Sequence, residues 1–198
     1  MPLLGITGGV ATGKSTFTRA LLRHLPAEFF DADQAAHTLL ASDENVREAV
    51  EKTFGPDILD TEGKPDRRRL RELVFSDEQS RKRLEEILHP AIRARWISLG
   101  ESARRAHTWL VVDIPLLYET GAESLCDHVA VVGCTPETQR QRLQLERGLS
   151  ATTAQGIISA QLDLQTKIQR ADHLIWNDST LGCLEAQAEL LASHLSHH

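Results

Sequence analysis

Apolar residues cluster in five short runs along the chain of 198 residues, and segments with helical spacing lie between most of them. Short continuous apolar runs are typical of strands that are buried on both faces of a sheet. The runs are 3–7, 28–30, 109–113, 128–133 and 173–176. Strands that alternate with helices form a parallel sheet with helices on both faces. The pattern therefore predicts an α/β fold with a five-stranded parallel sheet.

The segment 36–107 interrupts this alternation, because it has helical spacing but no convincing strand. Helices are expected at 67–75, 78–88 and 92–106, and His89-Pro90 is expected to mark a helix boundary. Residues 64–105 hold 12 basic and 7 acidic side chains, a net charge of +5, against −11 for the rest of the chain. We interpret 36–107 as a helical insertion in a single domain of residues 1–198, with a basic part that could face an anionic ligand.

A glycine-rich loop joins the first predicted strand to the first predicted helix. Residues 8–15 read GGVATGKS and match the pattern G-x-x-x-x-G-K-[ST], and they lie between a predicted strand and a predicted helix, as this motif requires. The alternative is an ordinary glycine-rich turn, which would not need this setting. The glycines let backbone N–H groups surround phosphates, while Lys14 reaches the β- and γ-phosphates and Ser15 ligates Mg²⁺. The fold is therefore expected to be of the P-loop NTPase type. The residues expected to bind the nucleotide here are Gly8, Gly9, Ala11, Thr12, Gly13, Lys14, Ser15 and Thr16.

Carboxylates follow two of the predicted strands. Asp31 and Asp33 come after the second strand, and either could accept the proton of an attacking hydroxyl; alternatively, Asp33 only caps the next helix. Asp113 ends the third strand, where a P-loop protein places a carboxylate for Mg²⁺, although aspartates are also common turn residues.

Arginines provide candidate phosphate contacts in two places. Thr135-Pro136 predicts a helix start, and Arg140 and Arg147 are expected to share a face of that helix, with Arg142 nearby. They could neutralise charge on a triphosphate, or they could be ordinary solvated side chains. A second group, with the same two interpretations, comprises Arg67, Arg68, Arg69 and Arg71.

Composition argues against several other classes of protein. The net charge of −6 and the pI near 5.8 argue against a nucleic-acid partner. Three cysteines without C-x-x-C spacing indicate neither a disulfide framework nor a zinc site. We find no apolar run of about 20 residues and no leader pattern, and therefore expect a cytoplasmic protein without a membrane partner, a monomer or weak homo-oligomer.

Six sequence blocks resemble the dephospho-CoA kinase family, in the same order, and the resemblance runs from about residue 3 to residue 180. The blocks are 7–16, 31–36, 88–92, 113–119, 135–139 and 171–177. The resemblance implies transfer of the γ-phosphoryl group of ATP to the ribose 3′-hydroxyl of dephospho-CoA, the last step of coenzyme A biosynthesis. A kinase for another small alcohol or nucleoside and a non-catalytic ATP-binding regulator are the alternatives.

The same resemblance implies roles for particular residues. Asp33 resembles the base that faces the acceptor hydroxyl, with Asp31 as the weaker candidate, and Arg147 resembles a phosphate contact. The insertion 36–107 is similar to the CoA-binding region and 138–165 to a lid over ATP. Asn177 is similar to a residue near the ATP base. Two positions depart from the family: Ile157 stands where many members have arginine, and the position of Asp113 varies among members.

Overall fold

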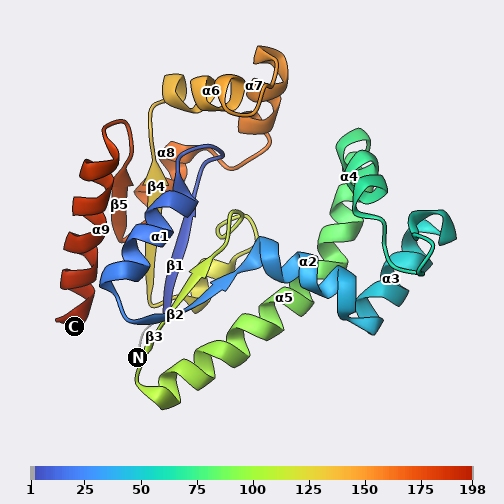
Figure 1. Cartoon of the computed structure of the whole chain (residues 1–198), viewed down its shortest axis with the longest axis horizontal. Helices are drawn as coiled ribbons and strands as arrows, with labels where there is room; N and C mark the ends of the chain where they lie inside the picture. Colours follow the sequence, from blue (N-terminus) through green and yellow to red (C-terminus); the bar gives the residue numbers. More distant parts are fainter. Residues whose placement is uncertain (1–2, 198) are drawn as a thin grey trace. The chain divides into compact units, whose positions relative to one another are not determined.

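The computed structural model describes residues 3–197, except for the side chain of Phe75 (Figure 1). The chain folds into two compact units. The first contains the residues up to Phe30 and those from Ser102 onward, and the second contains Asp31–Glu101.

The first unit is built on a five-stranded parallel sheet with the strand order β2-β3-β1-β4-β5. The strands are β1 (Leu3–Gly8), β2 (Ala27–Asp31), β3 (Trp109–Asp113), β4 (His128–Gly133) and β5 (His173–Trp176). This confirms the predicted α/β class and all five strands, and three of them have the predicted bounds. In the register of the central strands Ile6 pairs with both Asp113 and Ala130, so β1, β3 and β4 end at the same edge of the sheet.

Helices α1 and α9 cover one face of this sheet, and they run side by side in Figure 1. Alternate strand residues such as Leu4, Ile6 and Val111 pack against them and are almost completely buried. On the other face Cys126 packs so closely over Gly5 that a Cβ at this position would approach its Sγ to 2.8 Å. The helices of this unit are α1 (Lys14–His24), α6 (Pro136–Leu145), α7 (Ala151–Ser159), α8 (Leu164–Gln169), α9 (Leu181–Ser196) and the 3₁₀ helix η2 (Ala122–Leu125).

The second unit is helical around a small core of its own. Its elements are α2 (Ala32–Ser42), α3 (Glu44–Phe54), the 3₁₀ helix η1 (Pro56–Ile58), α4 (Arg67–Ser76) and α5 (Glu78–Ala106), whose last residues belong to the first unit. Leu39, Val50 and Leu70 are buried in this core. Asp66 begins α4 by accepting the backbone N–H groups of Arg68 and Arg69, and the pKa of Asp66 is lowered mainly by the bond from Arg69.

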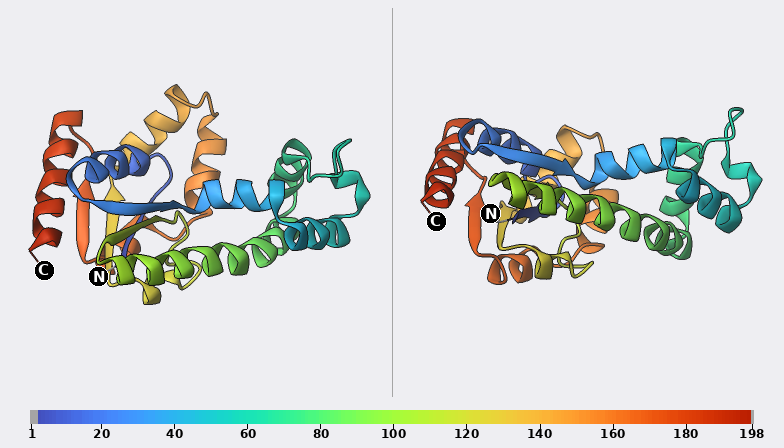
Figure 2. Two further views of the ribbon diagram at one scale, coloured as in Figure 1. Left: turned by 60° about the horizontal axis from the view of Figure 1, so that its bottom comes forward. Right: turned by 90° about the horizontal axis from the view of Figure 1, so that it is seen from below.

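The predicted helix boundary at His89-Pro90 is wrong, because α5 runs without interruption from Glu78 to Ala106 (Figure 2). A proline inside a helix removes one backbone hydrogen bond and costs about 3 kcal/mol. Leu88 and Trp96 are buried on the two sides of Pro90. Burial of large apolar side chains contributes about 1.5–3 kcal/mol each, which is enough to offset the proline.

Among residues 3–197, no helix is both long enough and apolar enough to cross a membrane. The three cysteines are free thiols in different surroundings: Cys134 is buried, Cys126 is half-buried and Cys183 is exposed. Burial raises the pKa of Cys126 to about 12 and that of Cys134 to about 11. Hydroxyl groups of Ser179 and Thr180 donate to the Cys183 sulfur and lower its pKa.

We expect a thiol reagent at pH 8 to label Cys183 rapidly in the folded protein. Only its sulfur is both exposed and stabilised as a thiolate, whereas burial protects Cys126 and Cys134. Absorbance with an aromatic disulfide reagent should show one fast thiol, and all three after unfolding in denaturant. Fast reaction of two thiols in the native protein would contradict the packing of Cys126 against Gly5.

Candidate active site

The glycine-rich loop between β1 and α1 contains two residues with left-handed backbone conformation. Ala11 has φ 58° and Gly13 has φ 91°, a region that L side chains rarely adopt. A Cβ on Gly13 would also lie only 2.1 Å from the side-chain nitrogen of Asn177. Closely spaced left-handed residues turn successive N–H groups toward one side, which forms an anion-binding concavity in front of the first turn of a helix.

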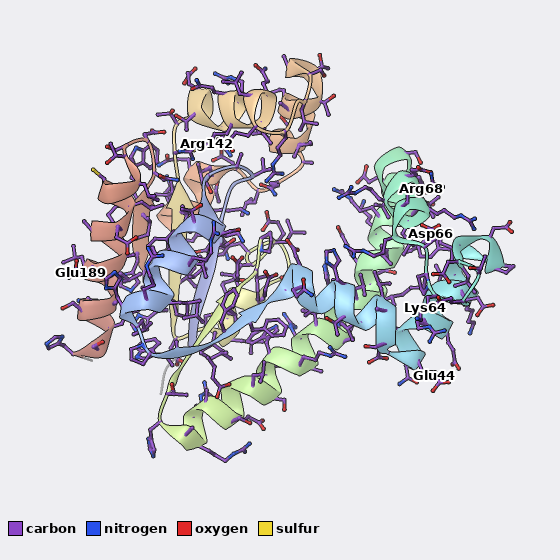
Figure 3. The ribbon with its side chains drawn as sticks, in the orientation of Figure 1. Glu44, Lys64, Asp66, Arg68, Arg142 and Glu189 are labelled. Atoms are coloured by element: carbon purple, nitrogen blue, oxygen red, sulfur yellow. The ribbon has the colours of Figure 1, made fainter. Side chains whose placement is uncertain are left out.

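Polar side chains from distant parts of the chain hold the carbonyl groups of this loop. Gln139 Nε2 donates to the carbonyl of Val10 at 2.7 Å, Arg142 Nη1 to that of Ala11 at 3.2 Å, and Asn177 Nδ2 to that of Thr12 at 2.8 Å. Arg142, on α6, is labelled in Figure 3. Three successive carbonyls are therefore satisfied by side chains, which fixes the direction in which each peptide group points.

These contacts involve one predicted site residue, Asn177, and two residues that were not predicted, Gln139 and Arg142. Asn177 lies at the loop, where its amide group donates to the backbone carbonyl of Thr12, and its predicted place near the ATP base stays a prediction. Arg142 also donates to the carbonyl of Asn177 at 2.9 Å, so its guanidinium links the loop to the end of β5. Sequence reasoning gave no role to Gln139 and mentioned Arg142 only as a neighbour, because nothing in the local pattern shows that these side chains meet backbone carbonyls 129 and 131 positions away.

Lys14 and Asp113 form an ion pair at the carboxyl edge of the sheet. Their side chains are only 15% and 6% exposed, and the Thr18 hydroxyl lies 3.4 Å from the second carboxylate oxygen. Pairing in such surroundings is much stronger than at an open surface. The structure thus brings the predicted lysine and the carboxylate that ends β3 together, next to Ser15, which is exposed in the first turn of α1.

The oxygen donors at this edge fit Mg²⁺ in chemistry. Among the described residues no group of three or more histidine, cysteine or acidic side chains could hold a metal ion. Mg²⁺ usually takes one or two protein oxygens together with substrate phosphates and water, rather than an all-protein cage. The Ser15 hydroxyl and the Asp113 carboxylate are donors of this kind, and their metal role stays a prediction.

The expectation that Arg140 and Arg147 share a helix face is wrong. Helix α6 ends at Leu145, and Arg147 is exposed in the turn that follows. Gly148 has φ 65°, a left-handed conformation that takes the chain out of the helix, and the N–H of Leu149 bonds back to the carbonyl of Leu143 at 3.2 Å. The glycine after Arg147 was the sequence signal for this end. Arg140 remains on α6, where it pairs with Glu137.

The two aspartates after β2 have different roles in the local structure. Asp31 Oδ1 accepts the backbone N–H of Gln34 at 2.9 Å and is the N-cap of α2. The alternative that Asp33 provides this cap is therefore wrong. Asp33 lies in the first turn of α2 and is exposed.

The basic segment of the second unit also divides into different roles. Arg69 donates to the carbonyls of Asp57 and Leu59, at 2.5 and 2.9 Å, and so holds the loop before α4. Arg67 lies 2.8 Å from a ring nitrogen of His37 on α2, and Arg68 is exposed on α4 (Figure 3). Arg69 is thus occupied by backbone contacts, while a contact of the other arginines with substrate stays a prediction.

A parallel sheet whose first strand leads through a glycine-rich loop into a Lys-Ser helix start defines a P-loop nucleotide-binding protein. The dephospho-CoA kinase family profile matches residues 2–182. The dephospho-CoA kinases of Symbiobacterium thermophilum and Geobacillus kaustophilus are each 40% identical over 190 residues, which cover 96% of this chain and 79% and 93% of theirs.

The comparison with solved structures also finds a dephospho-CoA kinase. The dephospho-CoA kinase from Campylobacter jejuni superposes with a TM-score of 0.70 at 29% identity, over 100% of this chain and 98% of that one. A protein from Thermus thermophilus gives 0.77 at 32% identity, over 99% and 97%. A shikimate kinase from Bacteroides thetaiotaomicron, with a TM-score of 0.53 at 15% identity, shares the fold.

The chain belongs to the dephospho-CoA kinase family and is an ATP-using phosphotransferase. The resemblance noted in the sequence is thereby confirmed. The roles of single residues, the lid at 138–165 and the CoA-binding function of 36–107 stay predictions.

We expect Gln139→Leu to weaken ATP binding. The change keeps the size of a side chain that is only 4% exposed but removes the donor to the Val10 carbonyl, and an unsatisfied buried carbonyl costs about 1–3 kcal/mol. Calorimetric titration should show the dissociation constant for ATP raised about tenfold, since about 1.4 kcal/mol corresponds to that factor. The matched control is Gln141→Leu, at an exposed position of the same helix. Equal ATP affinity in both variants would contradict the role of this bond.

Proposed function

We propose that this chain transfers the γ-phosphoryl group of Mg²⁺-bound ATP to the ribose 3′-hydroxyl of dephospho-CoA and releases ADP and coenzyme A. The observation that carries the proposal is the phosphate loop, with its carbonyls fixed by Gln139, Arg142 and Asn177 in a member of the dephospho-CoA kinase family. Phosphoryl transfer depends on positioning and on electrostatic stabilisation, and a rigid loop of directed N–H groups supplies both.

In this mechanism the loop and the start of α1 bind the phosphates of ATP. The backbone N–H groups at the start of the helix and the positive end of the helix dipole favour negative charge there. Lys14 would exchange part of its contact with Asp113 for the β- and γ-phosphate oxygens. The residues proposed to bind the nucleotide are Gly8, Gly9, Ala11, Thr12, Gly13, Lys14, Ser15, Thr16 and Asn177.

Ser15 and Asp113 would hold the metal ion, together with the phosphates. Held there, the ion would supply positive charge that offsets the negative charge of the phosphates. The ion pair with Lys14 orients the Asp113 carboxylate at this edge of the sheet.

Asp33 would accept the proton of the acceptor hydroxyl. It is exposed and does not cap α2, whereas the carboxylate of Asp31 is engaged by the N–H of Gln34. Asp33 follows the end of β2 by two residues, and the carboxyl ends of parallel strands are where such folds bind ligands. Asp31 is the weaker candidate for the same step.

The segment 138–165 would close over ATP and exclude water, which otherwise competes with the hydroxyl as acceptor. Arg147 is exposed in the turn between α6 and α7 and would contact a phosphate when the segment closes, whereas Arg140 would first have to leave Glu137. The insertion 36–107 would bind dephospho-CoA, with the exposed arginines of α4 as candidates for its diphosphate.

The direct test is mass spectrometry of the products formed from Mg-ATP and dephospho-CoA, beside adenosine and other alcohol acceptors. We expect dephospho-CoA to gain one phosphoryl group and to become coenzyme A. Phosphate on another acceptor alone would assign the chain to a different small alcohol. ATP binding without any transfer would indicate a regulator.

We expect Asp33→Asn to lower kcat by on the order of 100-fold or more, because a positioned general base contributes about that much. ATP binding should be unchanged, since Asp33 has no part in the phosphate loop. The matched control is Glu44→Gln, which removes an exposed carboxylate from the first turn of the next helix, α3 (Figure 3). Steady-state kinetics with both substrates would make the comparison, and near-normal turnover of the Asp33 variant would assign the base elsewhere.

A further inference from the structure

Lys167, on α8, is a lysine whose side chain is 0% exposed. Lysine is almost never fully buried unless its charge is paired. Its Nζ forms an ion pair with Glu119 at 2.8 Å and donates to the backbone carbonyl of Pro115 at 3.2 Å. Both partners lie in the loop that follows β3, so one buried ammonium group joins this loop to α8.

The partner carboxylate has a second donor. Glu119 Oε1 also accepts the backbone N–H of Leu162 at 3.0 Å, and Leu162 lies between the end of α7 and the start of α8. The same oxygen therefore binds Lys167 and the backbone at the C-terminal end of the segment proposed as the lid. We call residues 161–167 the lid root.

The lid root is also connected to the phosphate loop. Gln161 Oε1 accepts the N–H of Val10 at 2.9 Å, and Val10 is the residue whose carbonyl accepts from Gln139. The Pro115 carbonyl that accepts from Lys167 also accepts from the hydroxyl of Thr7, at 3.0 Å, just before the loop begins. One direct bond, from Val10 to Gln161, and one indirect link, through the Pro115 carbonyl that Lys167 and Thr7 share, thus join the lid root to the phosphate loop and the residue before it.

Stability alone is a weak reason for such a pair. Removing two charges from water costs several kcal/mol for each ion, and well-packed apolar residues often stabilise a protein as much or more. A charged pair with shared hydrogen bonds instead holds the segments that it joins in one arrangement, because each donor has a fixed acceptor.

We propose that Lys167 and Glu119 are positioning residues for the phosphotransfer reaction. They fix the lid root against the loop after β3, so that Gln161 holds the N–H of Val10 and the phosphate loop keeps its binding shape. This inference rests on the proposed function only for its kinetic consequence. Neither side chain is assigned a contact with a substrate.

The kinetic test compares Lys167→Met with Arg23→Met, which breaks an exposed pair with Glu185 between α1 and α9. We expect kcat/KM for ATP to fall by about 10- to 100-fold in the first variant, because small displacements of positioned groups have effects of this size. The KM for dephospho-CoA should stay within about twofold. The Arg23 variant should match the wild type, and an equal rise in the KM for both substrates in Lys167→Met would overturn the inference.

The double variant Glu119→Leu/Lys167→Met separates positioning from stability, because it leaves no unpaired buried charge. We expect it to fold with a Tm near that of the wild type and still to show the ATP defect. A folded double variant with wild-type kcat/KM for ATP would overturn the inference, whatever Lys167→Met alone does. An inactive wild type in this assay would instead count against the proposed function.

Hydrogen exchange provides a readout that needs no substrate. In the double variant the Leu162 amide loses its acceptor and should exchange faster. We expect the Val10 amide to exchange faster as well, because its acceptor Gln161 belongs to the displaced lid root. Faster exchange at Leu162 with an unchanged rate at Val10 would show that the lid root does not hold the phosphate loop.

Discussion

The site depends on one constraint, which is that the peptide groups of the phosphate loop must point in a single direction. The loop contains the left-handed residues Ala11 and Gly13, and the carbonyl groups of Val10, Ala11 and Thr12 take their donors from distant parts of the chain. The side chains of Gln139, Arg142 and Asn177 supply them. Because those donors come from α6 and from the end of β5, the correct packing of these elements is a condition for a correctly shaped loop. Folding and nucleotide binding are therefore linked through a few polar contacts.

The central strands bring the chemical groups together at low conformational cost. The register that pairs Ile6 with Asp113 places the end of β3 beside the end of β1, and Lys14 meets Asp113 across this edge. Since the strands are buried and the helix start is rigid, neither group relies on a mobile loop for its position. Preorganised charges of this kind are the main source of catalysis when little covalent chemistry is left to the protein.

Local patterns were sufficient for the strands and for the phosphate loop, because burial and turn chemistry repeat over a few residues. They failed where a tertiary contact outweighs a local preference. Pro90 does not end α5, since buried side chains on both sides offset the lost hydrogen bond. Arg147 left the predicted helix face because Gly148 ends α6, a signal that was present in the sequence. No local pattern indicates that Lys167 is buried and paired, because its partner Glu119 is 48 positions away and only the fold brings them together.

Two polar residues outside the predicted site bind the phosphate loop at the same position. Gln139 and Gln161 bind the carbonyl and the N–H of the same residue, Val10, from the two ends of the segment proposed as the lid. A movement of either end must therefore strain or break a bond to the phosphate loop, whereas a movement of α7 between them need not. The buried pair of Lys167 and Glu119 sets where the second of these ends stands. In the proposed lid, closure over a nucleotide would then be confined to the stretch between two fixed points, so that a mobile cover and a rigid phosphate site could coexist in one small unit.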